Sequence, residues 1–144
     1  MEKQTYAKHA KLVPMFHGVL AGLLVLTFFG SLVNLYRSLG DHSRLYNASL
    51  ITAISIAMIL LFYFCRSFAL KAQDRAIRAE ENLRHFVLTG KTLDSKLTMK
   101  QIIGLRFASD AEFVDLARKT AAEGLSQDSV KRAVKNWRAD HDRL

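Results

Sequence analysis

The sequence predicts an all-α protein: an integral membrane hairpin of two transmembrane helices, with the second helix extended into a small cytoplasmic helical module. Residues 13–36 contain no charged side chain over 24 positions, and residues 47–65 contain none over 19. A hydrocarbon core about 30 Å thick is crossed by about 20 apolar residues in a helix. The only proline, Pro14, lies in the first turn of the first stretch, where it removes no helical hydrogen bond. Both stretches therefore predict membrane-spanning helices.

A soluble core or a signal peptide fits the apolar stretches less well. A buried helical hairpin in a soluble protein would need a comparable amount of amphipathic sequence around it, and only 79 residues follow residue 65. A cleaved signal peptide has a shorter apolar run, about 7 to 15 residues, and a small-residue cleavage site that is missing here. We therefore expect the first stretch to be a retained span.

The distribution of Lys and Arg predicts which side of the membrane the termini face. The connecting loop, residues 37–46, contains only two basic residues, whereas eight flank the other ends of the spans. Those eight are Lys3, Lys8, Lys11, Arg66, Lys71, Arg75, Arg78 and Arg84. An excess of positive charge marks cytoplasmic flanks, so both termini are expected in the cytoplasm. The predicted parts are a basic N-terminal arm (1–12), a transmembrane hairpin (13–65), a cytoplasmic helical extension (66–90) and a module of three short helices (91–144).

Small residues recur at four- and eight-residue spacing in both spans. The helix-packing candidates are Gly18, Gly22 and Gly30 in the first span and Ser49, Ala53 and Ala57 in the second. Rows of small residues let helix backbones approach closely in lipid. We expect them to pack the two spans of one chain together; dimerisation through Gly18 and Gly22 is the alternative.

The segment after the second span predicts one continuous helix. Residues 66–88 contain neither Gly nor Pro, and Gly90 is suited to the C-terminal cap. Apolar residues alternate by three and four positions in a heptad-like seam: Ala69, Ala72, Ala76, Ala79, Leu83 and Phe86. The seam predicts a close neighbour, and the chain's own C-terminal module is favoured over a second copy. Lys71, Arg75 and Arg78 share another face and are expected to attract anionic lipid headgroups.

The last 54 residues predict three short helices that fold against the long one. Thr98 with Gln101 and Ser109 with Glu112 form capping-box patterns, and Ser126 is placed to cap the last helix. Between the first two helices, Arg106, Phe107, Ser109 and Asp110 are expected to form a structural elbow rather than a binding site. In it Phe107 is buried, Ser109 is a cap, and Arg106 pairs with Asp110. Trp137 is expected to be the core residue of the last helix.

The last predicted helix also carries a basic face made of Lys131, Arg132, Lys135 and Arg138. From residue 66 onward the chain has 16 basic and 11 acidic residues. A basic stripe is typical of a surface that meets nucleic acid, a ribosome or anionic lipid. The solvated or lipid-facing interpretation is favoured over binding of nucleic acid or a ribosome.

Signals for catalysis or cofactor binding are missing from the sequence. The five histidines are scattered along the chain without the spacing of a metal site, and neither a Gly-rich phosphate loop nor a nucleophile elbow is present. We therefore expect no enzyme and no cofactor, but a membrane interaction or scaffold protein or an accessory subunit of a membrane complex. The alternative is a membrane tether for ribosomes or nucleic acid.

Three segments carry a resemblance to a known family. The runs QIIGLRFASDAEFVDL (101–116), SVKRAVKNWRAD (129–140) and ENLRHFVLTGK (81–91) are similar to segments of an uncharacterised, domain-of-unknown-function family of short bacterial membrane proteins with two spans. The resemblance covers most of the chain and is best over residues 73–140. It implies a location in the bacterial cytoplasmic (inner) membrane and supplies no activity, ligand or catalytic residue.

Overall fold

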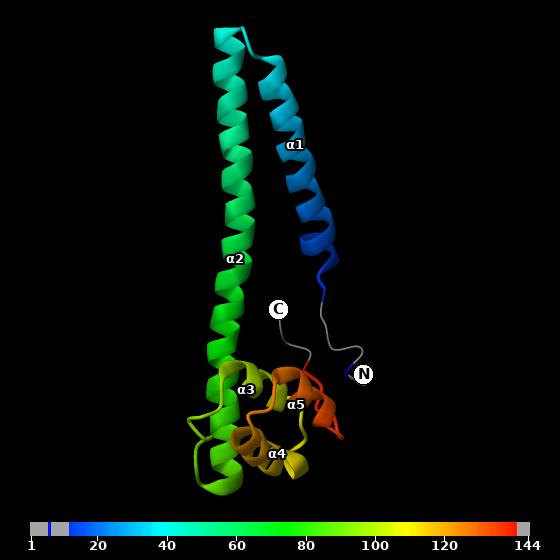
Figure 1. Cartoon of the computed structure of the whole chain (residues 1–144), viewed down its shortest axis with the longest axis vertical. Coiled ribbons are helices and arrows are strands. Elements are labelled where there is room, and N and C mark those ends of the chain that lie inside the picture. Colours follow the sequence, from blue (N-terminus) through cyan, green and yellow to red (C-terminus); the bar gives the residue numbers. More distant parts are fainter. Residues whose placement is uncertain (1–5, 7–11, 141–144) are drawn as a thin grey trace. The chain divides into compact units, whose positions relative to one another are not determined.

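The computed structural model describes Tyr6 and residues 12–140, and its main elements are helices (Figure 1). One isolated β-bridge is also present among the described residues. The π-helix η2 (Met15–Leu20) leads into α1 (Ala21–Arg37), and α2 (His42–Thr89) follows after a short turn. Three short helices complete the chain: α3 (Met99–Leu105), α4 (Asp110–Glu123) and α5 (Gln127–Ala133). The cations Lys3, Lys8 and Lys11 of the predicted N-terminal arm, and the histidines His9 and His141, lie outside the described residues.

The chain divides into two compact units, and α2 contributes to both. One unit is Leu12–Phe68; the other contains the described residues from Ala69 onward. In the first unit, the helical segment Met15–Arg37 and the first part of α2 are long and apolar enough to cross a membrane. Most side chains of both segments are exposed.

Hydroxyl groups join the two apolar helices of the first unit. Ser31 of α1 and Ser55 of α2 share a hydrogen bond of 3.2 Å between their Oγ atoms, and Thr52 Oγ1 donates to the Ser31 carbonyl at 3.4 Å. Each hydroxyl is also within hydrogen-bond distance of a carbonyl of its own helix: Ser31 of Phe28, Thr52 of Ala48 and Ser55 of Thr52. Because a hydroxyl has one proton, the contacts within and between the helices share it, and each buried hydroxyl has a partner between two otherwise apolar surfaces.

The small-residue rows are not the surface through which the two apolar helices pack. A Cβ placed on Gly18, Gly22 or Gly30 would meet no other atom within 4 Å. Ser49, Ala53 and Ala57 are exposed, whereas Ala48, Thr52 and Ser55 are buried. The expectation that these rows pair the two spans within one chain is therefore wrong. The hydroxyl-bearing face of α2 occupies the contact instead, because it offers hydrogen bonds as well as close approach. Dimerisation through Gly18 and Gly22 stays a prediction.

The predicted continuity of the second helix is confirmed, as are the local caps. Helix α2 runs without interruption for 48 residues, and Gly90 follows it with φ of +73°. Thr98 and Gln101 form a capping box on α3, and Ser109 and Glu112 form one on α4. Ser126 Oγ accepts from the N–H of Ser129 at the start of α5. These ends are set by side chains adjacent in sequence, which is why the sequence predicts them.

The core of the second unit lies between α3, α4, α5 and one face of α2. Leu105, Phe107, Phe113 and Val130 are completely or almost completely buried. Ile77 is the buried apolar residue that α2 adds to this core. Gly104 lets α3 and α5 approach closely: a Cβ on it would lie 3.1 Å from the Gln127 carbonyl oxygen and 3.1 Å from the Val130 side chain.

The last helix is shorter than predicted. Helix α5 ends at Ala133, and Val134 has an extended backbone with ψ of 120°. The next two N–H groups, of Lys135 and Asn136, donate to the Glu112 carboxylate at 3.1 and 2.9 Å. Beyond them the Arg138 N–H donates to the Phe107 carbonyl at 2.7 Å, and Trp137 pairs with Ala108 in the β-bridge. The expectation that Lys135, Trp137 and Arg138 continue a helix is therefore wrong, because Glu112 and Phe107 bind the N–H groups that a helix would use.

The close contact at Gly104 predicts that Gly104→Val destabilises the second unit by about 1–3 kcal/mol, the usual cost of overpacking. The added side chain must displace the start of α5 or the Val130 side chain. Thermal unfolding of the full chain, followed by the near-ultraviolet signal of Trp137, measures the change.

The matched control is Lys100→Val, which introduces the same side chain on an exposed position of the same helix. It should change the unfolding midpoint little. Equal midpoints for the two variants would show that α3 and α5 do not meet at Gly104.

Candidate functional site

The part of α2 that belongs to the second unit has two faces with different environments. Ile77 and Glu81 are buried under the short helices, and Arg84 is nearly so. We call the surface around these residues the covered face. The heptad-like positions Ala72, Ala76, Ala79, Leu83 and Phe86 are exposed; with Ala69 at its start, this surface is called the open seam.

Arg84 is the centre of the covered face. Its Nη1 donates to Glu81 Oε2 at 3.0 Å, its Nε to Asp110 Oδ1 at 2.6 Å, and its Nη2 to the Ala108 carbonyl at 2.7 Å. The guanidinium lies 4.2 Å from the centroid of the Phe113 ring. Only 10% of the Arg84 side chain is exposed. One side chain therefore joins α2 to the start of α4 and to the elbow before it through hydrogen bonds, charge and ring contact.

Glu81 is the buried carboxylate that Arg84 neutralises. Its side chain is 5% exposed, and Arg138 Nη1 lies 3.8 Å from its other oxygen. Burial raises the pKa of Glu81 above its ordinary value of 4.5, and the hydrogen bond and charge of Arg84 and the charge of Arg138 offset this only in part. Two arginines that come from different elements thus offset part of the cost of burying this carboxylate in its charged form.

The elbow between α3 and α4 contains a buried Phe107, as predicted, but its ion pairs differ from the prediction. Phe107 is fully buried, and its ring centroid lies 4.9 Å from that of Trp137. Arg106 Nη1 lies 3.2 Å from Asp140 Oδ2, and Asp110 binds Arg84. The expected Arg106–Asp110 pair is therefore replaced by two pairs that reach other elements. Both partners are distant in sequence, so spacing within the elbow did not reveal them.

The open seam corrects a second expectation. Leu83 is 64% exposed and Phe86 is 52% exposed, and the adjacent Val87 is 74% exposed. The chain's own module, which the sequence favours as the neighbour of the seam, packs on Ile77, Glu81 and Arg84 instead. Hydrophobic periodicity missed the covered face because two of these three residues are charged. The one local signal for it was the i,i+3 spacing of Glu81 and Arg84.

Several predicted basic residues contact groups of their own chain. Arg132 Nε donates to Asp128 at 2.8 Å, and its guanidinium lies 5.0 Å from the Tyr6 ring. The pKa of Asp128 is lowered, first by a hydrogen bond from the Tyr6 hydroxyl and then by the charge of Arg132. Lys131 lies 5.8 Å from the Phe107 ring centroid.

The remaining predicted basic residues lie on α2 and on the segment that follows α5. Arg138 is turned towards Glu81, and Lys135 is exposed beyond the end of α5. Lys71, Arg75 and Arg78 are exposed on α2. The basic face predicted for one helix is therefore divided between α5 and the extended segment that follows it.

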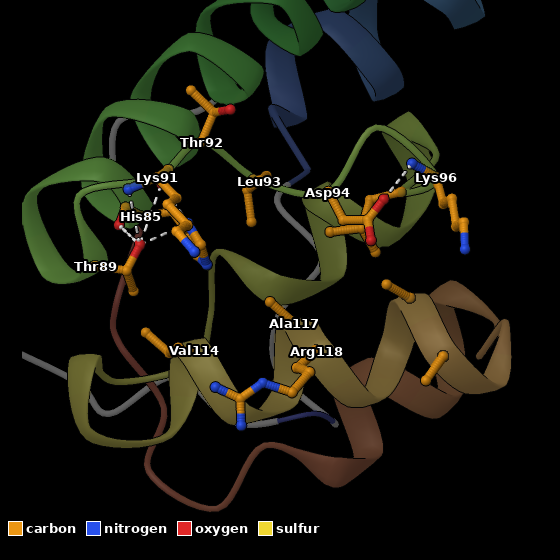
Figure 2. A pocket seen from close by; sticks show the side chains of 13 residues that line it. His85, Thr89, Lys91, Thr92, Leu93, Asp94, Lys96, Val114, Ala117 and Arg118 are labelled. Carbon is orange, nitrogen blue, oxygen red and sulfur yellow. Dashed lines mark hydrogen bonds between the residues drawn. The ribbon is translucent and has the colours of Figure 1, made fainter.

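An open hollow of about 650 Å³ lies between the end of α2, residues 91–97 and α4 (Figure 2). His85 Nδ1 is 2.7 Å from the Lys91 carbonyl oxygen, and Thr89 hydrogen-bonds to both residues. Arg118, at the α4 side, pairs with Asp115. The polar side chains of His85, Thr89, Asp94 and Arg118 are thus engaged in local bonds. In the described part of the chain, no group of three or more His, Cys, Asp or Glu side chains is arranged to hold a metal ion.

A family model matches residues 1–144, and its description is a family of unknown function (DUF6526). The chain belongs to this family. No curated protein and no solved structure matches the chain. The resemblance to an uncharacterised family is thus confirmed over the whole sequence, and no relative supplies an activity for this DUF6526 member.

The Arg84 contacts predict that Arg84→Met destabilises the second unit by about 3 kcal/mol, because removing one partner leaves a buried charge on Glu81. Chemical unfolding of the full chain measures this loss. The double variant Glu81→Leu/Arg84→Met should recover at least half of it, since no charge is then stranded. A double variant no more stable than Arg84→Met would show that the Glu81 charge is not the cause.

The raised pKa of Glu81 predicts a pH dependence of stability. Below 4.5 the carboxyl is protonated in both folded and unfolded chains. As pH rises through the higher folded-state pKa, the folded protein must lose a proton that it holds more tightly, so stability falls. Above pH 4.5 the free energy of unfolding of the wild type should therefore fall relative to that of Glu81→Gln. A difference that stays constant or changes in the opposite direction would contradict this assignment.

Proposed function

We propose that the chain is a non-enzymatic, two-span protein of the bacterial cytoplasmic membrane, with both termini in the cytoplasm. In this proposal its cytoplasmic part, through the exposed face of α2 opposite the C-terminal module, binds another membrane-associated protein, as a scaffold or as an accessory subunit of a membrane complex.

The exposed apolar surface of Leu12–Phe68 supports the membrane location. Large side chains such as Leu26 (72%), Phe29 (60%) and Ile54 (62%) are exposed on helices long enough to span a bilayer. A helix that is apolar around its circumference needs either a protein core or lipid around it. Lipid satisfies this surface without further protein. The excess of Lys and Arg outside the connecting loop supports the orientation.

The open seam is the observation that carries the interaction proposal. It places Leu83 and Phe86 in solvent on a helix whose opposite face is already occupied by the module. Exposed apolar surface of this kind marks protein–protein contact sites. The neighbouring cations Lys71, Arg75 and Arg78 are exposed and add attraction to anionic headgroups of about 1 kcal/mol each.

The alternative of a ribosome or nucleic-acid tether has less support. It was based on a continuous basic helix, but Arg132 is paired with Asp128 and Arg138 with Glu81. Phosphate binding at these positions would have to replace contacts that the chain already makes.

The proposed orientation predicts a labelling pattern in intact cells. In a Cys65→Ser background, Leu39→Cys in the connecting loop should react with a membrane-impermeant maleimide, and Lys96→Cys in the module should react only after the membrane is opened. Both positions are exposed, so access is limited by the membrane alone. Labelling of Lys96→Cys in intact cells would contradict the orientation, and release of the protein by alkaline carbonate would contradict membrane insertion.

The interaction proposal predicts that a partner protein co-purifies with the chain through the open seam. The test is purification in lipid nanodiscs at increasing salt concentration. The co-purifying partner should be a protein whose binding persists at high salt, and Leu83→Glu should reduce its recovery at least tenfold. The control variant Lys131→Glu/Lys135→Glu should leave recovery unchanged; Arg138 is kept because it contacts Glu81. The alternative, a ribosome or nucleic-acid tether, predicts a different result. RNA or ribosomal protein would then co-purify at low salt, dissociate as the salt concentration rises, and be missing from the Lys131→Glu/Lys135→Glu variant.

A further inference from the structure

We propose that the partner of the open seam is a second copy of this chain, and that the two α2 helices form a parallel two-stranded coiled coil over residues 69–87. The inference rests on the proposed function, because insertion in the same membrane with the same orientation makes the two helices parallel.

The spacing of the open seam is that of coiled-coil core positions. Ala69, Ala76 and Leu83 are seven residues apart, and Ala72, Ala79 and Phe86 follow each of them by three residues. In heptad notation these are three successive a and d pairs. A seam with this period is complementary to itself, because the a and d positions of one helix meet the same positions of the other.

The charges beside the seam match in a parallel pair. With Ala76 at position a, Glu80 is at position e of the same heptad and Arg75 is at position g of the preceding one. In parallel coiled coils, a g residue faces the partner residue five positions later, so Arg75 of each copy faces Glu80 of the other. Two symmetric ion pairs follow. Both side chains are exposed, and neither forms an ion pair with another described residue.

The module leaves this surface clear. Ile77 and Arg84 are at position b, Glu81 is at position f and His85 is at position c of the same heptads. These are outward positions of a coiled coil, and the module covers them. The module also reaches one flanking g position, where Asn82 Oδ1 accepts a hydrogen bond from the Leu93 N–H at 3.2 Å. A second α2 helix therefore meets the a and d positions without any rearrangement of the core built on the covered face.

The residue sizes along the seam suit two copies held in one membrane. Alanine at four successive core positions permits close approach but buries little area, whereas Leu83 and Phe86 supply larger apolar groups. A weak seam is sufficient when both helices are anchored, because anchoring raises the effective concentration of one relative to the other.

Cysteine crosslinking in isolated membranes tests the geometry with the full chain. In a Cys65→Ser background, Ala79→Cys places a thiol at position d, opposite its counterpart, and the matched control Arg78→Cys places one at the outward position c. Mild oxidation should yield a disulfide-linked dimer at least about tenfold faster for Ala79→Cys, because only thiols whose Cα atoms approach within about 7 Å are joined. Equal rates at the two positions would overturn the proposal.

Charge exchange tests the register without altering the seam. Arg75→Glu puts two carboxylates opposite each other and should raise the dimer dissociation constant in lipid about tenfold, as should Glu80→Arg. The double variant Arg75→Glu/Glu80→Arg should restore wild-type affinity, because the pairs are reversed but intact. A double variant as weak as either single one would contradict the parallel register.

The same variants separate this inference from the proposed function. Suppose that Ala79→Cys gives no crosslinked dimer, but Leu83→Glu still abolishes recovery of a different membrane protein whose binding persists at high salt. Self-association is then overturned, and the scaffold proposal stands. If Leu83→Glu changes neither self-association nor recovery of any companion, both proposals fail.

Discussion

The buried guanidinium of Arg84 is the interaction on which the second unit depends. It connects α2 to Asp110 at the start of α4 and to the Ala108 carbonyl, and it neutralises Glu81 within α2 itself. A charged group so deeply buried is stable only when its hydrogen bonds are satisfied, so its partners must be held in place. Phe113, under the guanidinium, ties this polar centre to the apolar core. The three short helices have too few residues for a large core of their own, and Arg84 makes α2 part of it.

Because the module packs on one face of α2, the other face stays exposed. The covered face uses Ile77, Glu81 and Arg84, and the open seam with Leu83 and Phe86 is consequently left for another molecule. The same division reduces the case for a basic binding surface, since Arg138 is drawn to Glu81. The ion pairs of the covered face and the exposure of the open seam thus arise from one arrangement of side chains around a single helix, and the proposed interaction role of the seam depends on this arrangement.

Features determined by neighbouring residues were predictable from the sequence, and features determined by distant ones were not. The end of α2 at Gly90 and the cap at Thr98 depend on local backbone and side-chain chemistry, and both are confirmed. The early end of α5 depends on Glu112, 23 residues before the N–H group it binds at Lys135. The seam was identified by its period, but a period does not specify the neighbour. A face that buries two charged residues gives no hydrophobic signal at all.

The environment of Arg84 can be measured directly by NMR of the full chain in nanodiscs with ¹⁵N-labelled arginine. Arg118, whose side chain is 76% exposed, is the internal reference. The account predicts that the Nε–H of Arg84 exchanges with solvent much more slowly than that of Arg118, and that its chemical shift moves when Phe113 is replaced by Leu. If the Nε–H of Arg84 exchanges as fast as that of Arg118, and its chemical shift does not change in Phe113→Leu, the module does not cover this face of α2.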